Sequence, residues 1–300
     1  MNTDNLTLPP CPVCGGTELK TAASEPGLTI IRCAGCSMLF SDPYCSQFTE
    51  KCGKCGNRCL KPDSAAPGYY AALSITPRLR LEKKRLERIR AVTGAVFTGK
   101  RVLEIGSGVG ALASLLHGEG ADYTGLEPVK MFYEKSVKSF PGLASRIKNI
   151  FLTGAALPEK HFDIIIAADV LEYVAGPVAL LARLKSHLRP GGRIYLEVPN
   201  ETFFLLRTWL RARLGLYSSL VHPGHVNFFN RKTMRLAAGG AGLRVASLRQ
   251  ISLLSDEERL RLTLKKELPA WLKAASWAAR RTRFDLPLQQ GNFVCVCGGE

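Results

Sequence analysis

The stretch from Val102 to Leu116, VLEIGSGVGALASLL, decides the fold class. An apolar run of strand length ends in glycines at alternate positions, Gly106, Gly108 and Gly110, and apolar residues then resume at helical spacing. A strand, a glycine-rich turn and a helix in this order predict a loop whose backbone approaches a ligand closely. The lysine and hydroxyl residue of a triphosphate-binding loop are absent, and the glycine spacing departs from the G-x-G-x-x-G of dinucleotide loops.

Short β-rich runs alternate with helical runs around this stretch. The first helical pattern is amphipathic, with Leu79, Leu86 and Ile89 on one face and the basic residues expected on the others. The alternation predicts an α/β domain with a mainly parallel, seven-stranded sheet and helices on both faces. Helices are expected over 69–92, 111–121 and 178–192, the last ending in Pro-Gly-Gly, and strands over 101–106, 122–128, 146–154, 162–170, 192–200, 243–252 and 292–297.

The cysteines gather in the N-terminal part, where eight of the ten precede residue 60. Cys11 and Cys14 form one C-x-x-C pair, Cys33 and Cys36 form another, and 18 residues separate the pairs, as in four-cysteine zinc ribbons. Two thiolates on such a tight turn can both reach one tetrahedral ion about 2.3 Å away. We expect a structural zinc site, since four sulfurs leave no open position, with iron as the main competitor.

A second group of cysteines follows within the same part of the chain. It could close a second zinc site, hold an iron–sulfur cluster or remain as free thiols, because its spacing is less diagnostic. Its members are Cys45, Cys52, Cys55 and Cys59. Residues 1–62 are therefore expected to form a zinc-binding module too short for a core of its own. Cys295 and Cys297 alternate on the last expected strand, and we expect them to be small buried apolar residues there.

The net charge of +16 lies almost entirely outside residues 1–62, whose six basic and five acidic residues nearly cancel. The excess concentrates in Pro77–Arg90 and in Phe203–Arg249, which has no acidic residue. Such a surface attracts nucleic acid, phosphorylated metabolites or an anionic membrane, or is simply a solvated basic face. Without a secretory pattern at the start or an apolar run of about 18 residues, we expect a cytoplasmic protein without a transmembrane segment.

The motifs together resemble those of class I S-adenosylmethionine-dependent methyltransferases. Glu104-Ile-Gly-Ser-Gly-Val-Gly110 is similar to the E/D-x-G-x-G-x-G of their first motif. The stretches FDIIIAADVLEYV, LRPGGRIYLEVPN and HVNFFNRKTMRLAAGGAGLRV are similar to later blocks, the last of them seen in bacterial small-molecule and glycan methyltransferases. A zinc ribbon ahead of this domain also occurs among sugar methyltransferases. The resemblance covers essentially the whole chain and implies a Rossmann-like fold over 63–300, with lid or insert segments at about 200–230 and 251–290.

The resemblance also implies a set of cofactor contacts. Glu104 would lie under the methionine part, Glu127 would hold the ribose hydroxyls, and the helix beginning near Gly108 would face the cofactor carboxylate. Ala155 replaces a residue that is often polar, which leaves the adenine to the backbone. The full set of expected cofactor residues is Glu104, Gly106, Ser107, Gly108, Gly110, Glu127, Pro128, Ala155, Asp169 and Tyr70.

Methyl transfer depends on alignment, and a base is needed only for a hydroxyl or C–H acceptor. His225, in VHPGHVNFFN, is our candidate base, with His222 as the alternative, because both follow the fifth expected strand. Tyr173, which stands where relatives carry a histidine, is the third candidate catalytic residue. His117, His161 and His187 are expected to be structural or surface residues.

We therefore expect an S-adenosylmethionine-dependent methyltransferase acting on a small polar or anionic molecule, such as a hydroxyl or carbon of a sugar, glycan or natural product. The first alternative is an RNA or protein methyltransferase that grips a polymer with the zinc module and the basic helix. The second is a zinc-dependent scaffold with a vestigial pocket. The Trp-bearing segments 203–220 and 256–283 suit a docked helix or a lid, and peripheral membrane contact is their alternative.

Overall fold

The computed structural model describes residues 9–25, 28–42, 75–201, 204–213, 225–251 and 292–299. The second cysteine group, Tyr70, His222 and most of the insert at 251–290 lie outside the described residues. The strands are β1 (Leu19–Glu25), β2 (Leu28–Cys33), β3 (Leu39–Asp42), β4 (Arg101–Ile105), β5 (Asp122–Leu126), β6 (Ile147–Lys148), β7 (Phe162–Ala168), β8 (Leu188–Pro199), β9 (Asn227–Phe228), β10 (Arg244–Ile251) and β11 (Asn292–Gly298). The helices are α2 (Ile75–Thr93), α3 (Ala111–Gly118), α4 (Lys130–Ser139), α5 (Pro177–His187), α6 (Phe204–Arg213) and α7 (Arg231–Gly240), with short 3₁₀ turns η2 (Pro141–Leu143), η3 (Leu152–Gly154) and η4 (Leu171–Tyr173).

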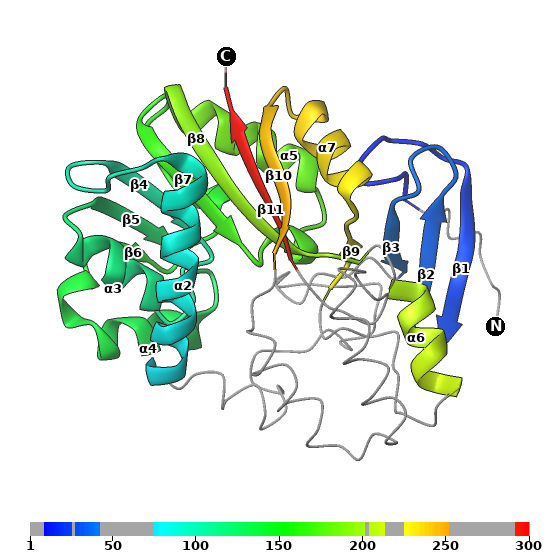
Figure 1. The fold of residues 1–300 in the computed structure, drawn as a ribbon, viewed down its shortest axis with the longest axis horizontal. Coiled ribbons are helices and arrows are strands. Elements are labelled where there is room, and N and C mark those ends of the chain that lie inside the picture. The colour runs from blue at the N-terminus through cyan, green and yellow to red at the C-terminus, as the bar shows by residue number, and fades with distance from the viewer. Residues whose placement is uncertain are drawn as a thin grey trace, which may run out of the picture.

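The large sheet has seven strands in the order β10-β11-β8-β7-β4-β5-β6 (Figure 1). Strands β8, β7, β4, β5 and β6 pair in parallel, and β11 is antiparallel to both of its neighbours. This confirms the Rossmann-like, mainly parallel sheet. The strand order reverses on either side of β4, and in such sheets ligands bind beside the carboxyl ends of the strands at that point.

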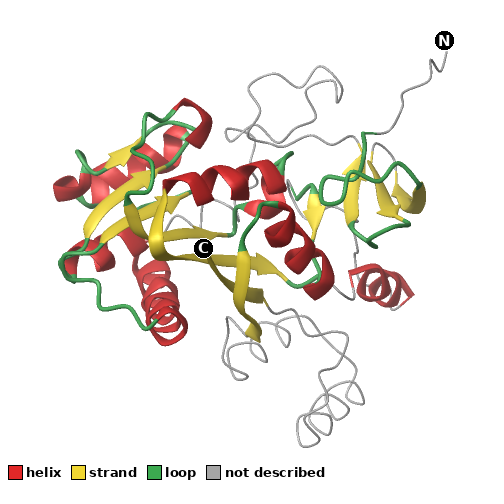
Figure 2. Cartoon of the chain, turned by 90° about the horizontal axis from the view of Figure 1, so that it is seen from above, coloured by secondary structure: helices red, strands yellow, loops and turns green. Residues whose placement is uncertain are grey.

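Two layers of apolar side chains bury the two faces of this sheet. One joins α2 and α3 to the sheet through Leu86, Ile89 and Leu116. The other covers the opposite face with side chains from α5 and α7, Leu181 and Met234 among them. Figure 2, seen from above, shows helices on both sides of the yellow strands. The core is therefore sandwiched between helical layers, as the alternating pattern predicts.

The small sheet joins the two parts of the chain. Its order is β1-β2-β3-β9, all antiparallel, so three strands of the cysteine module are completed by residues from far downstream. Leu39 pairs with Phe228 and Phe40 with Asn227. The fully buried side chains of Phe40 and Phe228 strengthen this junction. Strands β1 to β3 of the N-terminal part therefore contact the C-terminal part directly through β9. The small sheet lies at the right of Figure 1.

Four local expectations differ from the structure. Helix α3 begins at Ala111 rather than near Gly108, because the glycines before it take left-handed backbone angles. Helix α5 ends at His187, and the Pro-Gly-Gly lies within β8, where the register with β7 shifts. The strand expected over 146–154 is only the two residues of β6. The basic residues of α2 do not all face outward, since Arg85 is buried.

Among the described residues, none of the helices combines the length and the apolarity that crossing a lipid bilayer requires.

Candidate cofactor and acceptor site

The glycine loop connects β4 to α3 and depends on positive φ angles. Gly106, Gly108 and Gly110 have φ of 73°, 56° and 78°. A Cβ on Gly110 would lie 2.9 Å from Ser136 Cβ, and one on Gly106 would lie 3.0 Å from Val170 Cγ2. Glycine is therefore required at both positions by backbone angle and by space. The Gly106 N–H donates to Leu126 O over 2.8 Å, which ties the loop to the end of β5.

Glu104 lies at the end of β4, just before this loop. Its carboxylate is 5% exposed and accepts a hydrogen bond of 2.5 Å from the Tyr123 hydroxyl. Burial raises the pKa of Glu104 to about 8, although the Tyr123 hydrogen bond opposes that rise. Gly125 makes this pairing feasible, since a Cβ there would lie 2.5 Å from the Tyr123 hydroxyl. A carboxyl held in this way can accept from a cationic donor that enters the cleft.

Glu127 follows β5 and turns its carboxylate back towards the loop. Its two oxygens accept from the backbone N–H groups of Gly108, over 2.7 Å, and Val129, over 2.8 Å. Burial raises the pKa of Glu127 to about 7, and those two N–H groups lower it. Each carboxylate oxygen keeps a further lone pair, so Glu127 can also accept from ligand hydroxyls. The Gly108 N–H, by contrast, is already engaged.

A small cleft lies between the glycine loop and α2. Ser107 contributes a buried hydroxyl oxygen that has no hydrogen-bond partner among the described residues. Arg78, half-buried on α2, and Glu82 meet across 3.0 Å at the mouth of this cleft. The lining residues are Arg78, Glu82, Arg85, Glu104, Gly106, Ser107, Val109, Ala111, Leu112 and Ala168. The cleft therefore offers charged groups of both signs and the buried Ser107 hydroxyl.

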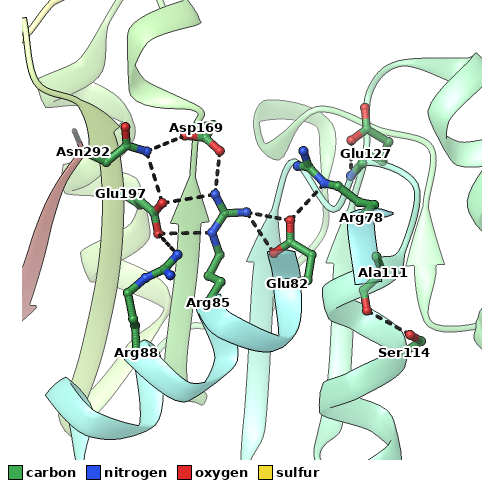
Figure 3. A network of polar contacts seen from close by, with 11 residues as sticks. Arg78, Glu82, Arg85, Arg88, Ala111, Ser114, Glu127, Asp169, Glu197 and Asn292 are labelled. Atoms are coloured by element: carbon green, nitrogen blue, oxygen red, sulfur yellow. Dashed lines mark hydrogen bonds and ion pairs between the residues drawn. The ribbon is translucent and has the colours of Figure 1, made fainter. Parts of the chain in front are cut away.

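Arg85 is the centre of an ion network that fastens α2 to the sheet (Figure 3). Its guanidinium donates to Glu82 Oε1 over 2.8 Å, to Asp169 Oδ2 over 2.7 Å and to Glu197 Oε2 over 3.1 Å. Arg78 and Arg88 add the second and third cations, so three arginines face three carboxylates. Because the charges balance and the geometry is close, the centre of the network at Arg85, Glu82 and Glu197 can remain buried, while Arg78 and Asp169 are partly exposed.

Glu197 is the residue of the central sheet that binds the arginines of this network. It lies in β8 with no solvent exposure and accepts from Tyr195 Oη over 2.7 Å and from Asn292 Nδ2 over 3.1 Å. Burial opposes its ionisation, but Arg85 and Arg88 lower the pKa of Glu197 to about 2. The Asn292 amide also donates to Asp169 Oδ1 over 3.3 Å. The network thus joins α2, β7, β8 and β11.

The candidate acceptor side lies around η4, just beyond β7. His225 is buried, its Nε2 lies 3.1 Å from the Tyr173 hydroxyl, and the two rings meet edge to face with centroids 4.8 Å apart. Glu172 beside them is 1% exposed, and burial with the nearby Asp169 charge raises the pKa of Glu172 well above its usual range. Val170, which touches the position of Gly106, links this cluster to the glycine loop. The structure therefore brings His225 and Tyr173 together, in a cluster that Val170 connects to the glycine loop.

The first cysteine group forms a compact quartet. The sulfur atoms of Cys11, Cys14, Cys33 and Cys36 all lie within 4.8 Å of one another. The Cys11–Cys36 and Cys14–Cys33 sulfur pairs are 3.5 and 3.6 Å apart, against about 3.8 Å for thiolates around tetrahedral zinc. A Cβ on Gly16 would lie 3.3 Å from the Cys14 sulfur, so glycine leaves the quartet its room. This donor set fits a structural metal ion.

The remaining predicted residues have simpler surroundings. Pro128 is half-buried between Glu127 and Val129, and Ala155 packs in the apolar core behind η3. Asp169 faces Arg85 and Asn292. His187 is buried against Pro158 O, and His117 is exposed. Cys295 and Cys297 are buried in β11, as expected.

Sequence reasoning missed the residues of the ion network: Arg78, Glu82, Arg85, Arg88, Glu197 and Asn292. One signal was available, because Glu197 is a single acid within the apolar run IYLEV of an expected central strand. A buried carboxylate needs a cationic partner, and α2 supplies arginines. The identity of that partner depends on a contact 112 residues away in the chain.

Comparisons with known proteins agree with this geometry. The chain is 29% identical over 145 residues to a ubiquinone biosynthesis O-methyltransferase of Yersinia pestis (strain Pestoides F), with 46% of this chain and 57% of the relative matched. The chain thus spans little more than half the length of that relative. Geranyl diphosphate C-methyltransferase from Streptomyces coelicolor A3(2) superposes with a TM-score of 0.52 at 12% identity, over 74% of this chain and 80% of that one. A geranyl diphosphate methyltransferase in complex with S-adenosylmethionine superposes with a TM-score of 0.52 at 16% identity, over 80% and 93%.

The structural similarities establish the fold, and a family profile establishes the membership. The profile described as "Methyltransferase domain" matches residues 78–248, more than half of the 300 residues. The matched range begins in α2 and ends in β10, so it includes the glycine loop, Glu127, the ion network's helix and the His225 segment. The chain belongs to the methyltransferase domain family.

Proposed function

We propose that this protein transfers a methyl group from S-adenosylmethionine to a small polar or anionic acceptor, at a hydroxyl or carbon of a sugar, glycan or natural product. The observation that carries the proposal is the pairing of two buried carboxyls, Glu104 and Glu127, with the glycine loop at the carboxyl edge of β4 and β5. When bound, S-adenosylmethionine supplies an electrophilic methyl group on a sulfonium centre.

The residues around the cleft suit that cofactor group by group. Glu104 can accept from its ammonium, and Glu127 can accept from its ribose hydroxyls through the lone pairs that the loop leaves open. The buried Ser107 hydroxyl can donate to an oxygen of the ligand. Arg78, half-exposed at the cleft, is the cation best placed for the cofactor carboxylate. The remaining expected contacts, from Pro128 and Ala155, belong to this proposal as well.

On the acceptor side we assign the general base to His225. The Tyr173 hydroxyl orients its Nε2, and the His225 ring is buried while Tyr173 remains partly exposed. A neutral imidazole there can take the proton of an acceptor hydroxyl as the new bond to carbon forms. The basic segment 203–249 supports an anionic acceptor, because it carries no acidic residue.

We also propose that the cysteine quartet binds zinc and that the protein works in the cytoplasm. A reducing compartment keeps thiols available to a metal, and burial of Cys11, Cys33 and Cys36 shields the ion from exchange. Four sulfur ligands leave no open position, so the ion's role is structural. Metal analysis of the purified protein tests this, with at least one zinc per chain as the expected result.

Calorimetric titration of the zinc-loaded protein with S-adenosylmethionine tests the cofactor assignment. We expect saturable binding that Glu104→Gln and Glu127→Gln each weaken about tenfold or more, the cost of a lost charge-assisted hydrogen bond. Absence of binding by the wild-type protein would favour the scaffold alternative.

His225→Gln should lower turnover with a sugar or natural-product acceptor by about 10² or more while cofactor affinity stays unchanged. Transfer to RNA or protein instead of small acceptors would favour the polymer alternative.

A further inference from the structure

The segment that carries His225 is bonded on both sides. Val226 donates its N–H to Glu172 O over 2.8 Å, in the turn that carries Tyr173. The carbonyl of the same residue accepts from the Ser41 N–H over 3.0 Å, in the cysteine module. A single residue next to His225 therefore connects the acceptor-side turn to the small sheet.

The neighbouring residue repeats the connection. Asn227 pairs with Phe40 in β3, and its side-chain amide donates to Leu171 O over 2.8 Å and to Val174 O over 2.7 Å. The Asn227 side chain thus binds the backbone at both ends of η4, while the Asn227 backbone belongs to the small sheet. Asn227 is 1% exposed, so these bonds are protected from water.

The path from this junction to the quartet is short. Cys33 ends β2, its N–H donates to Met38 O over 2.9 Å, and β2 pairs with β3 at Ile31–Phe40. Three of the quartet's residues also belong to the same buried apolar cluster as Met234 and Ala237 of α7. A segment this short gains part of its order from metal, so we expect the geometry of β3 to depend on the quartet being bound as well as on its pairing with β9.

We propose that the metal-bound cysteine module positions His225 and Tyr173, so that metal loading governs methyl transfer to the acceptor while cofactor affinity is independent of it. Asn227 is the positioning residue that transmits the geometry. This inference rests on the proposed function for the activity readout, whereas its structural readout does not. Among the described residues, the cofactor side contributes no strand to the small sheet. It meets the module through side-chain packing, in which Leu103 and Ile105 share the apolar cluster of the quartet, so we expect cofactor affinity to change far less than turnover.

The test compares zinc-loaded, chelated and zinc-reloaded protein by three measurements. We expect chelation to shift or broaden the NMR signal of the His225 ring, assigned with His225→Gln, while the signals of His117, His161 and His187 stay in place. Affinity for S-adenosylmethionine should change by less than about twofold, and kcat should fall about tenfold or more, since displacements of about 1 Å are costly. Zinc alone should restore both the signal and kcat.

Four variants at three residues separate positioning from general stability. Cys14→Ser should reproduce chelation, and Cys297→Ala, which removes a cysteine outside the quartet, should not. Asn227→Ala should keep its zinc yet lose kcat and shift the His225 signal, with Asn227→Ser recovering part of both. Cofactor affinity that falls in parallel with kcat, or a His225 signal indifferent to zinc, would overturn the inference. Failure of the proposed function would look different, because a protein that binds no S-adenosylmethionine would still report the coupling in the His225 signal.

Discussion

The cofactor side of the cleft and its acceptor side draw their residues from the chain in different ways. Glu104, the glycine loop and Glu127 come from one uninterrupted β-α-β segment, and their mutual contacts run through backbone N–H groups. The acceptor side assembles η4, the segment after His225 and a strand of the N-terminal module. Residues close together in the sequence can be recognised as one site from the sequence alone. Residues from distant segments form a site only through the strand order of the folded sheet.

Arg85 links the two sides, so its loss should have the largest effect. Arg85→Leu leaves Glu82, Asp169 and Glu197 facing one another without their central cation, and stability should fall by about 3–5 kcal/mol in chemical denaturation. Arg90→Gln is the matched control in the same helix, because its pair with Glu119 is exposed to solvent. Similar losses in both variants would show that α2 is not held by the buried network.

Substitutions in the glycine loop perturb the cofactor side without changing a residue of the acceptor side. Gly110→Ala meets Ser136 at 2.9 Å and should destabilise the protein by about 2–4 kcal/mol, combining left-handed strain with overpacking. Gly108→Ala shares the positive φ, but no atom lies within 4 Å of its Cβ, so only about 1–2 kcal/mol is expected. Thermal unfolding of the two variants, followed by cofactor titration, measures the difference. Equal shifts would mean that the contact with Ser136 carries no cost.

Tyr173→Phe tests whether the Tyr173 hydroxyl orients His225. It removes the hydroxyl that lies 3.1 Å from His225 Nε2 but keeps the edge-to-face ring contact. Loss of one orienting hydrogen bond should lower kcat by about tenfold and leave the affinity for S-adenosylmethionine unchanged. A variant with full turnover would show that His225 is oriented by other contacts.

The pH dependence of the cofactor side tests Glu104 and Glu127 without a substitution. Glu104 and Glu127 have pKa values raised to about 8 and about 7 from an ordinary value of 4.5, so the folded ligand-free protein holds protons that the unfolded chain releases. The free energy of unfolding should therefore fall as pH rises from about 4.5 to about 8. Affinity for S-adenosylmethionine should rise over the upper part of that window, because its donors favour ionised carboxylates.

Tyr123→Phe tests the same point. The Tyr123 hydroxyl lowers the pKa of Glu104, so its removal should raise that pKa further and move the gain in affinity to higher pH. Tyr133→Phe on α4 serves as the control. Calorimetric titrations between pH 6 and 9 measure both variants, and identical profiles would place the titrating group elsewhere.

Much of the fold and the geometry of the glycine loop could be predicted from local sequence. The apolar alternation predicted the seven-stranded sheet, and positive φ at the glycines explains their spacing. The C-x-x-C pairs predicted the cysteine quartet. The Arg85 network and β9 were not predicted, because an arginine's partner and a two-residue strand leave no periodic signal. Both exist only once distant strands are adjacent in space.

The position of β11 has a consequence for how the chain reaches this structure. Its seven residues lie between β10 and β8, are buried throughout and come from the last part of the sequence. During synthesis β8 and β10 must wait with exposed edges until residues 292–298 leave the ribosome. The network around Glu197 is also incomplete before Asn292 arrives. The sheet can therefore be completed only after residues 292–298 are synthesised, because β11 pairs with β8 across about 100 residues of sequence.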